Sequence, residues 1–135
     1  IDQLPVDFDG TTDECRTVSF KVPSDVTSGT VTFRAYWYSA AATTGNIIWD
    51  VRHNSGVAEG VDPDQALTTV AAAADSTQGT AGQLTFTTWT ETIANLAWAA
   101  NDQVDAEFCR DANNASDTLV GDARTTGFGV DIPRA

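Results

Sequence analysis

Residues 30–54 read TVTFRAYWYSAAATTGNIIWDVRHN and decide the fold. Apolar residues recur at every second position in both halves of this stretch, first as Val31, Phe33, Ala35 and Trp37 and then as Ile47, Trp49 and Val51. This period of two is typical of β-strands that bury one face. Each half therefore predicts a strand, with a loop around Gly45 between them. Trp37 and Trp49 fall on the apolar faces, and we expect their rings to form the centre of the core.

Short alternating runs continue through the rest of the chain and are interrupted by Gly, Pro, Asn, Asp and Ser. This rhythm is typical of an all-β protein. We expect strands at 4–8, 15–22, 30–38, 46–53, 66–72, 83–93, 103–110 and 124–132, and helix at most as a turn near 57–65 or 95–100. Eight strands in 135 residues fit one domain spanning 1–135, built as a two-sheet antiparallel β-sandwich. The jelly roll and the immunoglobulin-like sandwich are the two candidate architectures.

The two cysteines distinguish between these architectures. In a jelly roll, the second and seventh strands in chain order are antiparallel neighbours, which places Cys15 beside Cys109. That alignment also pairs Val18 with Ala106 on the apolar face and leaves both cysteines on the polar face. We therefore predict a Cys15–Cys109 disulfide, a jelly roll, and a protein that resides outside a reducing cytosol. The alternative interpretation is a pair of unrelated free thiols.

The charge of the chain excludes several kinds of partner. It has 19 acidic and 7 basic residues, a formal net charge of -12, and Lys21 is its only lysine. Nucleic acid and anionic membrane surfaces both require a basic contact surface, so neither is an expected partner. The acidic surface is typical of proteins that stay soluble in high salt, and equally of an ordinary acidic exterior.

The sequence contains no catalytic motif that we recognise. His53 is the only histidine and closes a predicted strand, and neither a G-x-S-x-G nor an H-E-x-x-H motif occurs. A histidine in that place is usually an edge or turn residue. We therefore expect no enzymatic activity; a small hydrolase built on His53 is the alternative.

An acidic turn near the N-terminus is the main candidate metal site, and Asp111, Asp117 and Asp122 form a second, weaker one. Four carboxylates surround Gly10, as Asp7, Asp9, Asp13 and Glu14. Calcium prefers such oxygen ligands, although the spacing is not that of an EF-hand. The turn predicts a weak calcium site or, as the favoured interpretation, an ordinary acidic turn, and we expect no other cofactor.

Three aromatic residues are candidates for contact with a partner. Tyr36 and Tyr38 alternate with Trp37 and so face away from the predicted core, and Trp89 lies on the opposite face from Leu84 and Phe86. Exposed rings of this kind stack on sugars or bind a second protein. We expect this face to be buried between copies of the chain, with a surface glycan as the alternative ligand.

Arg110 ends a predicted strand on its apolar face. An unpaired buried guanidinium is costly, so this side chain needs an acid, and the following loop offers Asp117 and Asp122. We expect one of these acids to form an ion pair that ties the loop to the sheet. The role of such a pair is structural.

Several short motifs together resemble a domain found in structural proteins of tailed-bacteriophage virions. They are FCRDANNASDTLVGDAR at 108–124, Gly127, the run 128–132, Val22-Pro23-Ser24-Asp25, Tyr36-Trp37 and Ile48-Trp49-Asp50-Val51. The similarity extends from about Val18 to Ile132. Domains of that family are small jelly rolls that serve as head-fibre, decoration or tail-associated modules and are often trimeric.

The resemblance implies a non-enzymatic virion surface module. Its expected partners are copies of itself, with a trimer favoured, other virion proteins and a glycan of the host surface, and its expected location is extracellular. A carbohydrate-binding module and a subunit of an extracellular filament or surface layer are the alternatives. The cysteine before Arg110 is not part of the resemblance.

Overall fold

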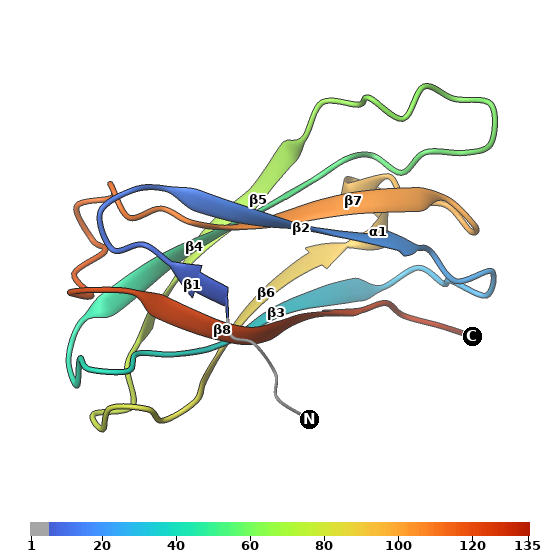
Figure 1. Cartoon of the computed structure of the whole chain (residues 1–135). Helices are drawn as coiled ribbons and strands as arrows, with labels where there is room; N and C mark the ends of the chain where they lie inside the picture. The colour runs from blue at the N-terminus through green and yellow to red at the C-terminus, as the bar shows by residue number, and fades with distance from the viewer. Residues whose placement is uncertain (1–5) are drawn as a thin grey trace.

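The computed structural model describes residues 6–135, which form two antiparallel sheets stacked face to face (Figure 1). Sheet A has the strand order β1-β8-β3-β6 and sheet B the order β2-β7-β4-β5. The elements are β1 (Val6–Phe8), β2 (Glu14–Lys21), β3 (Thr30–Tyr38), β4 (Asn46–His53), β5 (Thr68–Ser76), β6 (Thr85–Thr92), α1 (Ile93–Leu96), β7 (Gln103–Arg110) and β8 (Ala123–Asp131). This order of eight strands is that of a jelly roll, so the predicted fold is confirmed.

The two strands of the deciding stretch form as the alternation predicts. β3 and β4 lie in opposite sheets, and every second residue of β3 from Val31 to Trp37 is buried. Trp37 and Trp49 are both fully buried. Around them pack aromatic rings from both sheets, including Phe8, Phe33 and Phe108. The core therefore lies between the sheets and is dominated by aromatic side chains, which bury large apolar areas.

The pairing of β2 with β7 has the predicted register. Cys15 lies opposite Cys109, and Val18 lies opposite Ala106. The two cysteines form a disulfide with a Cα–Cα distance of 4.0 Å and a sequence separation of 94. The predicted bridge therefore links the edge strand β2 to the neighbouring strand of sheet B.

Some element boundaries differ from the expectations. β5 continues to Ser76 instead of ending at residue 72, because Asn46 at the start of β4 pairs with Ser76 and extends the ladder. Residues 58–69 are all exposed, so a helix in 57–65 would have no core to pack on, and none forms. The short helix lies at Ile93–Leu96, slightly before the expected turn. The start of the first predicted strand, at residues 4 and 5, lies outside the described residues.

Candidate functional site

The most distinctive surface is the outward face of sheet A, which we call the aromatic face. Its residues are Tyr36 and Tyr38 from β3, Phe86 from β6, and Leu84, which directly precedes β6. Phe86 is 59% exposed and Leu84 is 44% exposed, whereas both tyrosines are half-buried. Exposed apolar residues that gather on one face make that face a candidate interaction surface.

Trp89 does not belong to this face, so its expected place there is wrong. Its side chain is 4% exposed and packs in the core, and the outward position on β6 belongs to Phe86. Two buried threonines share the inward side of β6 with Trp89. The Thr87 hydroxyl accepts a hydrogen bond from Trp37 Nε1 at 2.8 Å and donates one to Asp75 at 2.9 Å. These two bonds satisfy the buried hydroxyl of Thr87. The alternation of apolar and polar residues, by contrast, predicts that Thr87 faces the solvent.

The rings of the aromatic face meet edge to face. Tyr36 lies opposite Phe86 across the β3–β6 pair, and their ring centroids are 5.1 Å apart at an interplanar angle of 74°. On the other side of Tyr36, β8 contributes Gly127 and Gly129, which carry no side chain to cover the tyrosine ring. The rings of the aromatic face therefore do not form one flat platform.

The outward charges of sheet A cancel. Its outward-facing strand residues carry two basic and two acidic side chains, which form the ion pairs Arg34–Asp131 and Arg124–Asp7. The whole chain, by contrast, has a net charge of -12. The aromatic face is thus a locally neutral surface on a strongly acidic protein, and it lacks the repulsion that would keep two acidic surfaces apart.

Arg110 and Asp117 form a buried ion pair at one end of the sandwich, with side chains 0% and 1% exposed. Nε of Arg110 donates to Oδ2 of Asp117 at 3.0 Å, and Nη2 donates to Oδ1 at 2.8 Å. The other hydrogen bonds of the guanidinium go to the carbonyls of Phe8, Leu119 and Gly121. All five N–H donors of Arg110 are therefore satisfied, as a buried guanidinium requires.

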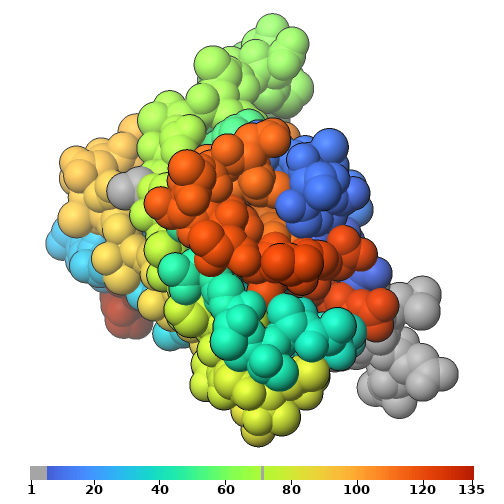
Figure 2. Space-filling view, turned by 90° about the vertical axis from the view of Figure 1, so that its left-hand side faces the viewer, coloured from blue at the N-terminus to red at the C-terminus, as the bar shows by residue number. Residues whose placement is uncertain are grey.

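The ion pair fixes the loop between β7 and β8. Asp122, the other acid considered for Arg110, is exposed. The loop also bonds to β4, because the amide of Thr118 donates to the carbonyl of Asn46 at 2.9 Å. At Gly45, any Cβ would lie 2.8 Å from Leu119. Figure 2 looks at this end of the sandwich, where the orange loop lies against the turquoise loop that precedes β4. This end of the sandwich is closely packed backbone.

The carboxylates of the acidic turn bond to protein groups instead of converging on a metal. Their partners are Arg124 for Asp7, the Thr11 amide and hydroxyl for Asp9, the Asn113 amide for Asp13 and the Asp9 amide for Glu14. The hydrogen bonds from Thr11 hold the pKa of Asp9 below its ordinary value of 3.8. Within residues 6–135, no three of these carboxylates bring oxygens within 4.8 Å of one another. The turn therefore has the geometry of an ordinary acidic turn.

His53 lies inside the molecule at the end of β4. It is 4% exposed, its Nδ1 donates to the carbonyl of Asn54 at 2.8 Å, and its ring meets Trp98 edge to face at 5.8 Å. A general base must reach a substrate, and these contacts leave the ring little access to one.

Asp50 lies beside the disulfide on the outward face of sheet B, where it opposes Cys109. Its half-buried position raises its pKa above 3.8, and the neighbouring charges of Asp111 and Asp13 add to this shift, whereas Arg52 opposes it. Glu107 lies within 4.8 Å of both disulfide sulfurs. Those sulfurs are bonded to each other, so they offer no thiolate for a metal.

Comparisons with known proteins give no family for this chain: no family model matches it, and no curated protein matches it significantly. The disulfide of this protein fits a secreted or extracellular location. In residues 6–135 there is no helix with the length and apolar character needed to span a bilayer.

Proposed function

We propose that the chain is a non-enzymatic structural module that assembles with copies of itself through the aromatic face, as part of a virion surface. The observation that carries the proposal is the exposure of Phe86 and Leu84 beside Tyr36 on a face whose ionised residues are paired. The jelly-roll fold and the sequence resemblance to virion modules support the virion setting. A closed trimer is the favoured assembly.

Electrostatics favours this face over the rest of the surface. Two copies that each carry a charge of -12 repel, and the repulsion is smallest where charges are balanced on both copies. Burial of exposed apolar side chains is the favourable term that such a contact needs. The aromatic face combines balanced charge with exposed apolar groups, so self-association through it is the arrangement that the described residues support best.

Sugar binding is less well supported by the same rings. Stacking on a sugar uses the flat face of an aromatic ring, and a row of rings in one plane binds a chain of sugars. Tyr36 and Phe86 are inclined at 74°, and Trp89 lies in the core. The face therefore resembles a packing surface more than a carbohydrate platform.

Sedimentation velocity of matched variants tests the proposal. Phe86→Ser removes the most exposed ring of the face and is expected to shift the protein from oligomer to monomer. Val120→Ser is the control, because Val120 is 84% exposed but lies in the loop between β7 and β8. A Phe86→Ser variant that sediments like the wild-type oligomer would contradict the proposal. A monomeric wild type whose glycan binding is lost on Phe86→Ser would instead favour the carbohydrate-binding module.

A further inference from the structure

Residues 58–67, which we call the arm, form an exposed segment between β4 and β5. Figure 1 shows this green segment extending beyond the ends of both strands, away from the two sheets. All of its residues are exposed, and a Cβ placed on Gly60 would meet nothing within 4 Å. A local turn shapes the arm, because the Val61 amide donates to the carbonyl of Ala58 at 3.2 Å. Long loops without secondary structure are uncommon in compact domains, and many of them bind a partner.

The arm presents one apolar side chain among acids. Val61 is 50% exposed and follows Gly60, which has a left-handed φ of 85°. Glu59, Asp62 and Asp64 lie on either side of this valine in the chain, and the arm contains no basic residue. An exposed valine beside three carboxylates is complementary to a surface with an apolar centre and a positively charged rim.

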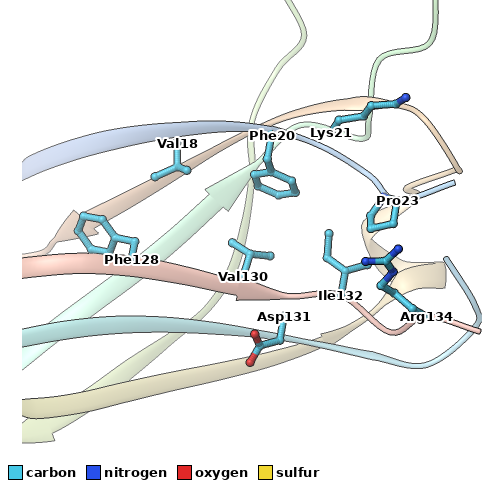
Figure 3. Close-up of a pocket in the computed structure, with 9 residues that line it drawn as sticks. All are labelled: Val18, Phe20, Lys21, Pro23, Phe128, Val130, Asp131, Ile132 and Arg134. Carbon is cyan, nitrogen blue, oxygen red and sulfur yellow. The ribbon is translucent and has the colours of Figure 1, made fainter. Parts of the chain in front are cut away.

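An apolar slot opens between the two sheets along the edge formed by β2 and β8. It has a volume of about 430 Å³ and is lined by Val18 and Phe20 from β2 and by Phe128, Val130 and Ile132 from β8 and the residues after it. Figure 3 shows Phe20 pointing across the slot toward Val130 and Ile132. These apolar residues are only half-buried, so the slot can take a further apolar side chain.

The rim of the slot carries a net positive charge. Its charged residues are Lys21, Arg134 and Asp131. Arg134 is paired with Asp25, and Asp131 is paired with Arg34. Lys21 is the only lysine of the chain and, within residues 6–135, has no ion-pair partner. On a chain with a net charge of -12, this rim is a favourable place for an acidic segment of another molecule.

We propose that the arm of one copy docks into the slot of the next copy, with Val61 between the apolar side chains and Asp62 beside Lys21. The arm leads into β5, one edge strand of sheet B, whereas the slot borders β2, the other edge strand. A contact between two such different surfaces is heterologous. Heterologous contacts close into rings, as the favoured trimer requires.

This docking rests on the proposed self-association through the aromatic face. One valine in a slot buries far less than the roughly 1,000 Å² that a stable interface needs. The arm contact therefore supplements the aromatic face and sets the orientation of neighbouring copies.

A cysteine pair in the full chain tests whether the arm and the slot meet. Val61→Cys combined with Val130→Cys is expected to form a disulfide between two chains, seen by peptide mapping of the oxidised protein. Thr80→Cys combined with Val130→Cys is the control, because Thr80 is equally exposed but lies in the loop between β5 and β6, and it is expected to keep both thiols. A disulfide within one chain, or equal cross-linking of the two pairs, would overturn the proposal.

Two charge-matched variants measure the contribution of Val61 to assembly. Val61→Asp is expected to raise the dissociation constant of the oligomer at least about tenfold in sedimentation equilibrium. Val120→Asp adds the same charge at a residue that is 84% exposed on another loop, and it is expected to leave the constant unchanged. Equal effects of the two variants would overturn the docking.

The outcomes separate this docking from the self-association on which it rests. A wild-type protein that assembles, while the Val61→Cys and Val130→Cys pair gives no disulfide between chains, overturns the docking alone. A monomeric wild type overturns both proposals.

Discussion

Asp117 holds Arg110 by two hydrogen bonds, of 3.0 and 2.8 Å, inside the end of the sandwich where β7 leads into the last loop. The guanidinium bonds as well to a carbonyl of β1 and to two carbonyls of that loop. One side chain at the end of β7 thus holds both the loop that follows β7 and β1, which is 102 positions away in the chain. The pair contributes mainly to the geometry of this end, because burying two charges costs much of the free energy that their attraction supplies.

Asp117→Asn is expected to destabilise the protein by about 3 kcal/mol or more, because it leaves a buried guanidinium without a counter-ion. Denaturant unfolding measures this loss. Asp122→Asn removes the same charge from an exposed position of the same loop and is expected to change the free energy of unfolding by less than about 0.5 kcal/mol. Similar losses for the two variants would show that the ion pair is not the source of the effect.

Replacing both cysteines by serine is expected to cost about 4.7 kcal/mol, as the chain-entropy model gives for a loop of this length. The bridge closes 94 positions, so the unfolded chain gains much freedom when it is absent. The β2–β7 ladder continues for eight residue pairs without it, and the far-ultraviolet circular dichroism of the folded variant should be unchanged. An unaltered unfolding midpoint would contradict the prediction.

Asp50→Asn is expected to stabilise the protein at neutral pH. The raised pKa of Asp50 means that the folded state binds a proton more strongly than the unfolded state does. The charged form therefore disfavours folding above the folded-state pKa, and this penalty disappears as the pH falls below the ordinary value of 3.8. Thermal melts from pH 7 to pH 3 should show a gain for Asp50→Asn that vanishes in acid. Glu59→Gln, in the exposed loop, removes the same charge and should show no such gain.

Calcium is expected to leave the melting temperature unchanged. The carboxylates of the acidic turn already accept hydrogen bonds or pair with Arg124, and binding a cation would break these contacts. Melts with calcium and then with a chelator measure the effect at constant ionic strength. A rise with calcium that the chelator reverses, and that Asp9→Asn abolishes, would contradict the prediction.

The strands that alternate cleanly were predictable from sequence. β3, β4 and β7 begin and end at the expected residues, because apolar and polar positions along them match the two faces of a sheet. The disulfide followed from the same alternation, since aligning the cysteines also aligned the apolar residues of β2 and β7. Arg110 could be linked to an acid of the loop between β7 and β8, because a guanidinium on the apolar face of a strand is costly to bury without a counter-ion.

The face of β6 could not be assigned in this way. Thr85, Thr87 and Trp89 point inward, whereas the apolar residue Phe86 points to solvent. The hydrogen bonds that make a buried Thr87 acceptable come from Trp37 and Asp75, on strands that only the fold brings near. An analysis that counts threonine as polar therefore exchanges the inward and outward faces of β6. For this reason it misses Phe86 as the central residue of the aromatic face. The four tryptophans of the chain, all at most 4% exposed, would have been the better guide.

The mass of the native protein in solution tests the central claim most directly. Light scattering after size-exclusion chromatography is expected to give a multiple of the 14.3 kDa of one chain, and about 43 kDa for the favoured trimer. Higher salt should strengthen the assembly by screening the repulsion between acidic copies. A particle of 14.3 kDa at all protein and salt concentrations would contradict self-association through the aromatic face.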